Sequence, residues 1–159
     1  MITCEKDTII IGVISDTHGL LRPEIKEIFK GVDYIIHAGD IGPPRIIADL
    51  SEIAPTLAVL GNTDAQIQFM AFDTVDFFET PYIKICIIHN IDYIDMDLKT
   101  AGYNIAISGH THMGSIINKN NILYFNPGSA GPKRRGCPVS VGLLRCNRQN
   151  YSPEIINLE

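Results

Sequence analysis

The sequence lacks closely spaced cysteine pairs, a secretory leader and long apolar runs. Its four cysteines, at positions 4, 86, 137 and 146, are too far apart for a zinc knuckle or a redox Cys-x-x-Cys motif. Residues 1–8, "MITCEKDT", carry charge but no apolar stretch, so no secretory signal is expected. No apolar run approaches the ~18–20 residues that a membrane span needs. We therefore expect a cytoplasmic protein with reduced thiols and no membrane contact.

The sequence also lacks a surplus of basic residues. It has 13 Lys and Arg against 18 Asp and Glu, for a net charge of −5, which argues against a duplex nucleic acid as partner. The basic cluster Lys133-Arg134-Arg135 is interpreted as a solvated loop, with contact to a phosphate left open. There is no internal repeat, low-complexity stretch or linker. A single domain over residues 1–159 is the simplest organisation.

Alternating strands and helices are predicted in the first 60 residues. Residues 8–15 form a continuous apolar run that is typical of a strand buried on both faces. Further strands are predicted at 33–37 and 56–60, and helices at 23–30 and 44–53, in the order β-α-β-α-β. This order is the signature of a parallel sheet covered by helices.

The second half is richer in strands. Residues 74–80 and 82–89, joined at Pro81, are expected to pair antiparallel, and 104–108 form another strand. Residues 114–126 are predicted to be a hairpin that turns at Asn120-Asn121. Strands follow at 140–146 and 153–158, and a short helix fits residues 95–101. We expect two sheets packed face to face with helices outside.

Polar side chains follow five of the predicted strands. Because ligands of α/β sheets bind at the carboxyl ends of strands, these side chains are expected to converge on one rim. Each one alone is more simply interpreted as a turn residue or a hydrogen-bonded core histidine. The five-way coincidence, which includes all five histidines, favours a site. The side chains are Asp16 and His18; His37 and Asp40; Asn62 and Asp64; His89; and His110 and His112.

The candidate ligands are too numerous for one metal ion. Seven side chains qualify, whereas one Zn²⁺ uses about three or four; if Asp40 bridges, each of two ions receives four contacts. Nitrogen and oxygen ligands suit Mn²⁺, our first choice, or Fe²⁺, Co²⁺, Ni²⁺ or Zn²⁺. Two divalent ions leave the site positive, which favours in-line attack on phosphorus by a metal-bridging hydroxide. The seven candidates are Asp16, His18, Asp40, Asn62, His89, His110 and His112; His37 is interpreted as structural or as acting from behind the ligands.

The motifs together resemble the calcineurin-like metallophosphoesterases, most of all their small single-domain prokaryotic phosphodiesterases. The resemblance rests on "DTH" at 16–18, "GD" at 39–40, "GNTD" at 61–64, His89, "GHTH" at 109–112 and "NPGS" at 126–129. It implies an α/β fold, a four-layer α/β/β/α sandwich of two mixed β-sheets flanked by helices. It also implies a first metal on Asp16, His18, Asp40 and His112, and a second on Asp40, Asn62, His89 and His110.

The resemblance further implies roles around the metals. Asp40, Asn62 and Asp64 would be catalytic, and Gly128 and Ser129 would contact the substrate, although a plain turn at Pro127-Gly128 is an equal alternative for the last two. Two positions depart from the family pattern. Thr63 stands where larger relatives carry a histidine as leaving-group acid, and a threonine hydroxyl cannot act as an acid near pH 7. Asn90 follows His89 where glycine is common.

The expected function is therefore that of a metal-dependent phosphodiesterase acting on a small phosphate ester. The alternative is a non-catalytic scaffold or binding protein on the same fold, like a eukaryotic retromer subunit, because fold does not fix function. A third possibility is a metal-stabilised domain without a substrate. The complete set of metal-competent side chains favours the enzyme. Strand edges in the antiparallel half leave a homo-oligomer open.

Overall fold

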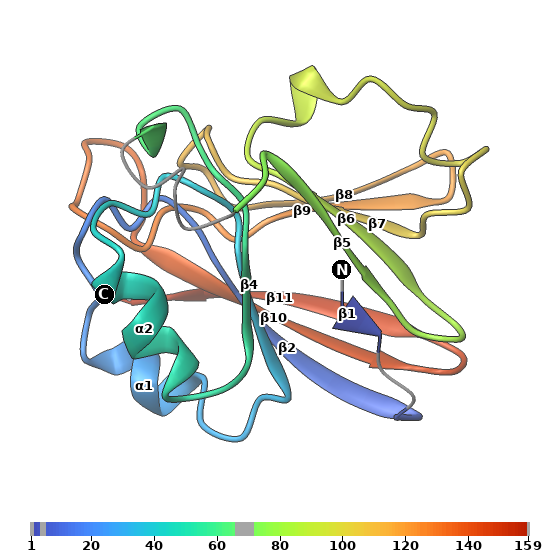
Figure 1. The fold of residues 1–159 in the computed structure, drawn as a ribbon, viewed down its shortest axis with the longest axis horizontal. Helices are drawn as coiled ribbons and strands as arrows, with labels where there is room; N and C mark the ends of the chain where they lie inside the picture. Colours follow the sequence, from blue (N-terminus) through green and yellow to red (C-terminus); the bar gives the residue numbers. More distant parts are fainter. Residues whose placement is uncertain (1, 4–5, 66–71, 159) are drawn as a thin grey trace.

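Two mixed β-sheets pack face to face in the computed structural model, which describes residues 2–3, 6–65 and 72–158 (Figure 1). One sheet has five strands in the order β11-β10-β2-β3-β4, and the other has six in the order β1-β5-β6-β7-β9-β8. This is the expected α/β sandwich of two mixed sheets. The strands are β1 (Ile2–Thr3), β2 (Thr8–Ile14), β3 (Tyr34–His37), β4 (Thr56–Ala58), β5 (Val75–Glu79), β6 (Lys84–Ile88), β7 (Ile105–Ile107), β8 (Ser115–Lys119), β9 (Ile122–Asn126), β10 (Ser140–Asn147) and β11 (Tyr151–Asn157).

The first half of the chain builds the parallel part of the five-stranded sheet, as predicted. β2 pairs with β3 and β3 with β4, both in parallel. Helices α1 (Glu24–Ile28) and α2 (Arg45–Ser51) cover the outer face of this sheet (Figure 1). Both helices are shorter than predicted, because the chain leaves each one through a turn with bonds to the third residue back, such as Ile53 N–H to Leu50 O.

The second half builds the other sheet and then returns to the first. β5 and β6 form the expected antiparallel pair. β8 and β9 form the predicted hairpin, in which Asn120 and Asn121 have φ of 54° and 64°, as a type I′ turn requires. β10 then runs antiparallel to β2, so the end of the chain closes the sheet that its beginning started.

The outer layer of the six-stranded sheet differs from the prediction of a helix at 95–101. A 3-10 helix, η2 (Ile91–Tyr93), lies earlier, and residues 97–101 form a single turn closed by the Ala101 N–H bond to Asp97 O. The Asp97 carboxylate binds the N–H groups of Lys99 and Thr100, and Gly102 at φ 82° ends the turn. Leu98 packs from this segment onto the outer face of the sheet.

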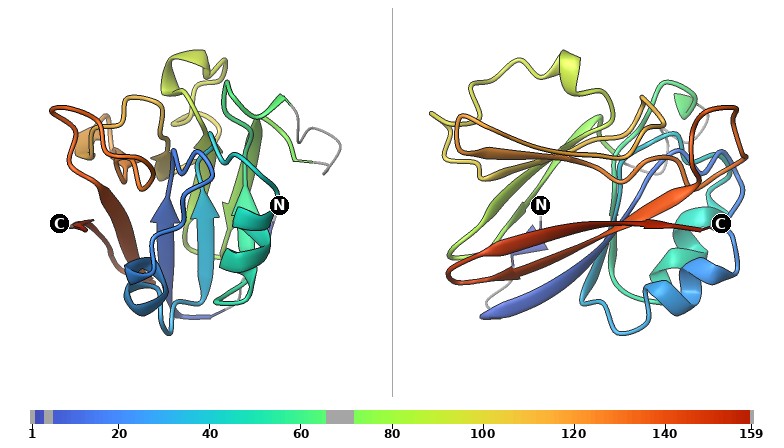
Figure 2. Two further views of the ribbon diagram at one scale, coloured as in Figure 1. Left: turned by 90° about the vertical axis from the view of Figure 1, so that its left-hand side faces the viewer. Right: turned by 180° about the vertical axis from the view of Figure 1, so that it is seen from behind.

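The main core lies between the sheets. Ile11 and Val13 of β2 face Ile85 and Ile87 of β6 within one cluster of buried side chains. In the left view of Figure 2, β2 and β3 point to the same side, and the loops that follow several strands gather there. None of the helices in the described ranges is long and apolar enough to cross a membrane. Three cysteines, Cys86, Cys137 and Cys146, are free thiols, and Cys4 lies outside the described residues.

Candidate metal centre

Four of the predicted ligands form a compact cluster at the strand ends. Asp16, His18, Asp40 and His112 each offer a ligand atom, and these atoms lie within 4.8 Å of one another. They come from the loops after β2, β3 and β7. The His112 Nε2 atom is 3.2 Å from Asp16 Oδ1, and the His18 and His112 rings stack with centroids 5.6 Å apart. The set is the one that the resemblance implied for a first metal.

Two further histidines adjoin this cluster. His89 follows β6 and His110 follows β7, and their rings meet edge to face with centroids 5.3 Å apart. The Asp40 Oδ2 atom lies 3.4 Å from His89 Nε2 and 3.8 Å from His18 Nε2. One carboxylate oxygen therefore faces both groups of histidines. Asn62 is exposed and lines the same pocket as His18, Asp40 and His110.

Within the part of the chain that the structure describes, several buried polar atoms of this centre have no hydrogen-bond partner. They are Asp16 Oδ1, His18 Nε2, His89 Nε2 and His112 Nδ1. Buried polar atoms in proteins are normally paired, so four orphaned atoms at one place call for a ligand. His89 Nδ1 donates to the Ala38 carbonyl over 2.7 Å, which turns Nε2 toward the centre. The donor set fits divalent cations bound by nitrogen and oxygen.

The charge of Asp40 is preserved in spite of its burial. Burial alone would raise the pKa of this carboxyl, but the His89 imidazole and the Thr63 N–H, 3.0 Å from Oδ1, hold the pKa well below its ordinary range. Asp40 is only 4% exposed. The carboxylate is therefore ionised at any working pH and offers a buried negative charge to a cation.

The backbone around the ligands is strained. Asp16, His18, Asp40, His110 and His112 all have φ between 45° and 70°, and in the described residues the other non-glycine cases are the hairpin asparagines. Such conformations are uncommon outside glycine and cluster at functional sites. Five strained backbones at five predicted ligands support the interpretation of this rim as a site.

Glycines allow the loops to approach the ligands. A Cβ atom at Gly61 would overlap Asp40 Oδ1, and one at Gly109 would overlap Ser15 Oγ. Ser15 in turn donates to Asp16 Oδ2 over 2.6 Å. The glycines of the "GN" and "GH" motifs are thus required by the close packing of backbone against carboxylates.

Asp64 lies behind the ligands, which does not support its predicted catalytic role. It is 1% exposed. Its Oδ1 accepts the N–H groups of Ile41 and Gly42, and its Oδ2 accepts the Gly61 N–H at 2.8 Å. Both oxygens are therefore occupied by backbone donors. Asp64 ties the loop after β3 to the loop after β4, and these loops carry Asp40 and Asn62.

Gly128 and Ser129, for which contact with substrate and a plain turn were equal alternatives, also lie behind the centre. Both are buried. The Gly128 N–H binds Asn126 Oδ1 at 2.9 Å, and the Ser129 hydroxyl donates to the Asp16 carbonyl at 3.2 Å. The "NPGS" segment thus braces the loop that carries Asp16.

Asn126 is a supporting residue that the sequence reasoning missed. Its amide donates to the Gly109 carbonyl at 2.7 Å and to Thr111 Oγ1 at 3.1 Å, so it holds the "GHTH" loop. It ends β9, and it carried the same signal of a polar residue after an apolar strand that identified the ligands.

His37 supports the loops from inside, in agreement with its interpretation as a structural residue. It is fully buried, with Nε2 2.9 Å from Thr17 Oγ1 and Nδ1 accepting the Gly39 N–H at 3.2 Å. Burial, and then the nearby His89, lower the pKa of His37 to about 3. It is a neutral imidazole with both nitrogens bonded.

An open pocket of about 420 Å³ lies over the centre. Of the basic cluster at 133–135, only Arg134 lines it, beside Cys137 and next to His112. Thr63 and Thr111 are also on its wall. The pocket therefore combines the predicted ligands with one guanidinium group, which suits an anionic ligand.

The fold and the centre define a class: an α/β sandwich with a candidate metal site of nitrogen and oxygen donors at the carboxyl ends of its strands. The model of the calcineurin-like phosphoesterase superfamily domain matches residues 9–149. The chain belongs to this family.

Similar proteins agree with the assignment. The chain is 36% identical to a probable metallophosphoesterase of Methanocaldococcus jannaschii, over 96% of this chain and 83% of that protein. It is 29% identical to a phosphodiesterase of the same archaeon, over 89% and 95%. The structure of vacuolar protein sorting 29 from Cryptosporidium parvum superposes with a TM-score of 0.77 at 18% identity, covering 96% and 100%, and shows the shared fold. The predictions of the family and of a hydrolase acting on phosphoester bonds are confirmed.

Proposed function

We propose that the protein is a phosphodiesterase with a dinuclear metal centre. The observation that carries the proposal is the position of Asp40 Oδ2 between His18 and His89, because a bridging carboxylate is what a two-ion centre needs. Together with Asp40, one ion would be coordinated by Asp16, His18 and His112. The other ion would be coordinated by Asp40, Asn62, His89 and His110. We propose Mn²⁺ as the ion, a small phosphate ester as substrate and the cytoplasm as the site of action.

Bound at this centre, two divalent ions would supply Lewis-acid polarisation of the phosphate and a nucleophile derived from water at neutral pH. The chain's own residues have the task of holding geometry and charge. Asp16 and Asp40 lower the positive charge of the centre, and the buried supports Ser15, Asp64 and Asn126 fix the loops. Catalytic centres of this kind depend on such pre-organisation.

Thr63 does not supply an acid for the leaving group. Thr63 lines the pocket at the position where larger relatives carry a histidine, and its hydroxyl cannot protonate a leaving alkoxide near pH 7. We therefore infer a preference for esters whose leaving group is a stable anion, such as a phenolate, over esters of simple alkanols.

The decisive experiment is hydrolysis of bis-p-nitrophenyl phosphate by protein stripped with a chelator. We expect nitrophenol release to require added Mn²⁺ and Asp40→Asn to abolish it with an unchanged circular dichroism spectrum. Asp49→Asn, which changes an exposed carboxylate on α2, serves as the matched control and should retain full activity. Turnover by Asp40→Asn at the wild-type rate would overturn the two-metal assignment.

The scaffold alternative has the similarity to vacuolar protein sorting 29 in its favour, which at 18% identity concerns the fold alone. The same experiment separates the two functions. Metal binding without hydrolysis under Mn²⁺, Ni²⁺, Co²⁺ or Zn²⁺ would favour the scaffold.

A further inference from the structure

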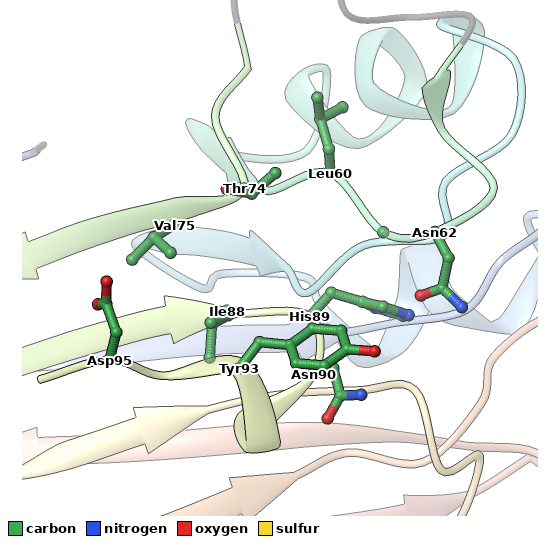
Figure 3. Close-up of a pocket in the computed structure, with 10 residues that line it drawn as sticks. Leu60, Asn62, Thr74, Val75, Ile88, His89, Asn90, Tyr93 and Asp95 are labelled. Carbon is green, nitrogen blue, oxygen red and sulfur yellow. The ribbon is translucent and has the colours of Figure 1, made fainter.

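A second pocket adjoins the centre on the His89 side and has a different character. It measures about 510 Å³ and shares Asn62 and His89 with the metal centre (Figure 3). Its other walls are largely apolar, with contributions from Leu60, Val75 and Ile88. A volume of this size lies in the range of pockets that hold small organic ligands.

An exposed aromatic ring stands at this pocket. Tyr93 is 79% exposed, although its backbone is anchored in η2 by the bond from its N–H to the Asn90 carbonyl. In Figure 3 the ring lies beside Asn90, with its hydroxyl end toward the side of His89 and Asn62. An aromatic ring that buries little of its own surface contributes little to the core, but it offers a stacking face to a flat ligand.

The two ends of the pocket differ in charge. His89 and Asn62 mark the end at the metal centre, and Asp95 lies at the opposite end with a carboxylate (Figure 3). A phosphate placed at the centre would therefore direct its organic group along apolar walls and past Tyr93 to a hydrogen-bond acceptor. A carboxylate there complements an amino group.

We propose that this pocket binds the organic group of the phosphoester, and that this group is a nucleobase with an exocyclic amine, stacked on Tyr93 and bonded to Asp95. The inference rests on the proposed function, because it uses the metal centre as the phosphate site. It makes nucleotide esters whose leaving group is a stable anion the substrate class, and Tyr93 and Asp95 the residues that select them. A nucleobase and a simple aryl group can both stack on Tyr93. The exocyclic amine of the base, which can bond to Asp95, distinguishes the nucleobase from the aryl group.

The test compares adenosine monophosphate, uridine monophosphate and ribose 5-phosphate as inhibitors of metal-dependent bis-p-nitrophenyl phosphate hydrolysis. We expect adenosine monophosphate to inhibit about tenfold more strongly than ribose 5-phosphate, in line with one stacked base. Tyr93→Ala should remove this difference and Tyr93→Phe should keep it. Asp95→Ala removes the acceptor and should weaken inhibition by adenosine monophosphate to the level of uridine monophosphate, whose base has no exocyclic amine.

Ile117→Ala is the matched control, because Ile117 is a 54% exposed apolar side chain outside this pocket. Saturation-transfer NMR on the base protons of adenosine monophosphate gives a readout that is independent of turnover. Active enzyme that is inhibited equally by adenosine monophosphate and ribose 5-phosphate would overturn the inference and leave the phosphodiesterase intact. A difference between the two nucleotides that Asp95→Ala leaves unchanged would overturn the role of Asp95. Saturation of the base protons without hydrolysis under any metal would support the pocket while the proposed function fails.

Discussion

Arg134 is the one residue of the basic cluster whose side chain can act on a ligand of the centre. It lines the pocket next to His112, whereas Lys133 and Arg135 do not line it. A guanidinium at the rim contributes to binding of an anion in the ground state and the transition state alike, which changes KM rather than kcat.

We therefore predict that Arg134→Ala raises the KM for bis-p-nitrophenyl phosphate about tenfold with little change in kcat, the size of one lost charged hydrogen bond. Arg135→Ala is the matched control and should leave both constants unchanged. Steady-state kinetics with Mn²⁺ distinguish the two variants. An equal rise in KM for both variants would show that Arg134 contributes only to the net charge around the pocket and makes no specific contact with the substrate.

His37 illustrates a support whose loss affects the fold more than the chemistry. Truncation of this fully buried ring leaves a cavity and an unpaired Gly39 N–H, while the Thr17 hydroxyl keeps its bond to the Ile41 carbonyl at 2.8 Å. We predict that His37→Ala costs roughly 2–4 kcal/mol of unfolding free energy and keeps most of the metal-dependent activity. Urea unfolding and the nitrophenyl assay measure the two effects. A loss of activity as large as that of His110→Ala would place His37 among the inner residues.

The sequence predicted that the polar residues lie together at the strand ends, but it did not predict which atoms each side chain contacts. Asp40 and Asp64 both follow a strand and a glycine, and both were assigned to catalysis. The structure separates them by their partners: Asp40 Oδ2 faces two histidines, while both oxygens of Asp64 accept backbone N–H groups. Apart from the Gly61 bond to Asp64, these contacts join residues more than 20 positions apart, which no local pattern encodes.

At the scale of the elements, the loops after β3 and β4 behave as one unit because Asp64 joins them. In Asp64→Asn, one carboxylate oxygen becomes an amide that faces an N–H donor. We predict a loss of about 1–3 kcal/mol of unfolding free energy and weaker Mn²⁺ binding, since Asp40 and Asn62 lie on the joined loops. Urea unfolding and metal titration check both effects, again with Asp49→Asn as the control. Unchanged metal affinity in a destabilised Asp64→Asn would show that the clamp serves stability alone.

The predictions of secondary structure were correct where one short local pattern determines the element. The buried strand β2 and the Asn-Asn hairpin were both predicted, since each is determined by a short stretch of sequence. The helix expected at 95–101 was wrong because Asp97 binds the N–H groups of a single turn and Gly102 ends it. Sheet order was beyond local reasoning, since β10 pairs with β2 across more than a hundred residues.

At the scale of the whole molecule, the candidate metal centre lies between both sheets. Its predicted ligands follow β2 and β3 of one sheet and β6 and β7 of the other, so an ion bound there would connect the two layers of the sandwich. The Asp16 and Asp40 carboxylates are buried together, and their repulsion destabilises the metal-free protein. Ions that bind only the folded state stabilise it by mass action.

We predict that Mn²⁺ at about 100 times its dissociation constant adds about 2.7 kcal/mol to stability and that a chelator removes this gain. For a chain of this size, that corresponds to a rise in Tm of roughly 5–10 °C. Asp40→Asn should lose most of the rise, because Asp40 is the residue that would contact both ions, while Asp49→Asn keeps it. Thermal unfolding followed by circular dichroism measures the shift. A Tm that is independent of Mn²⁺ in the wild type would contradict a site that joins the sheets, even if metal binding were detected by other means.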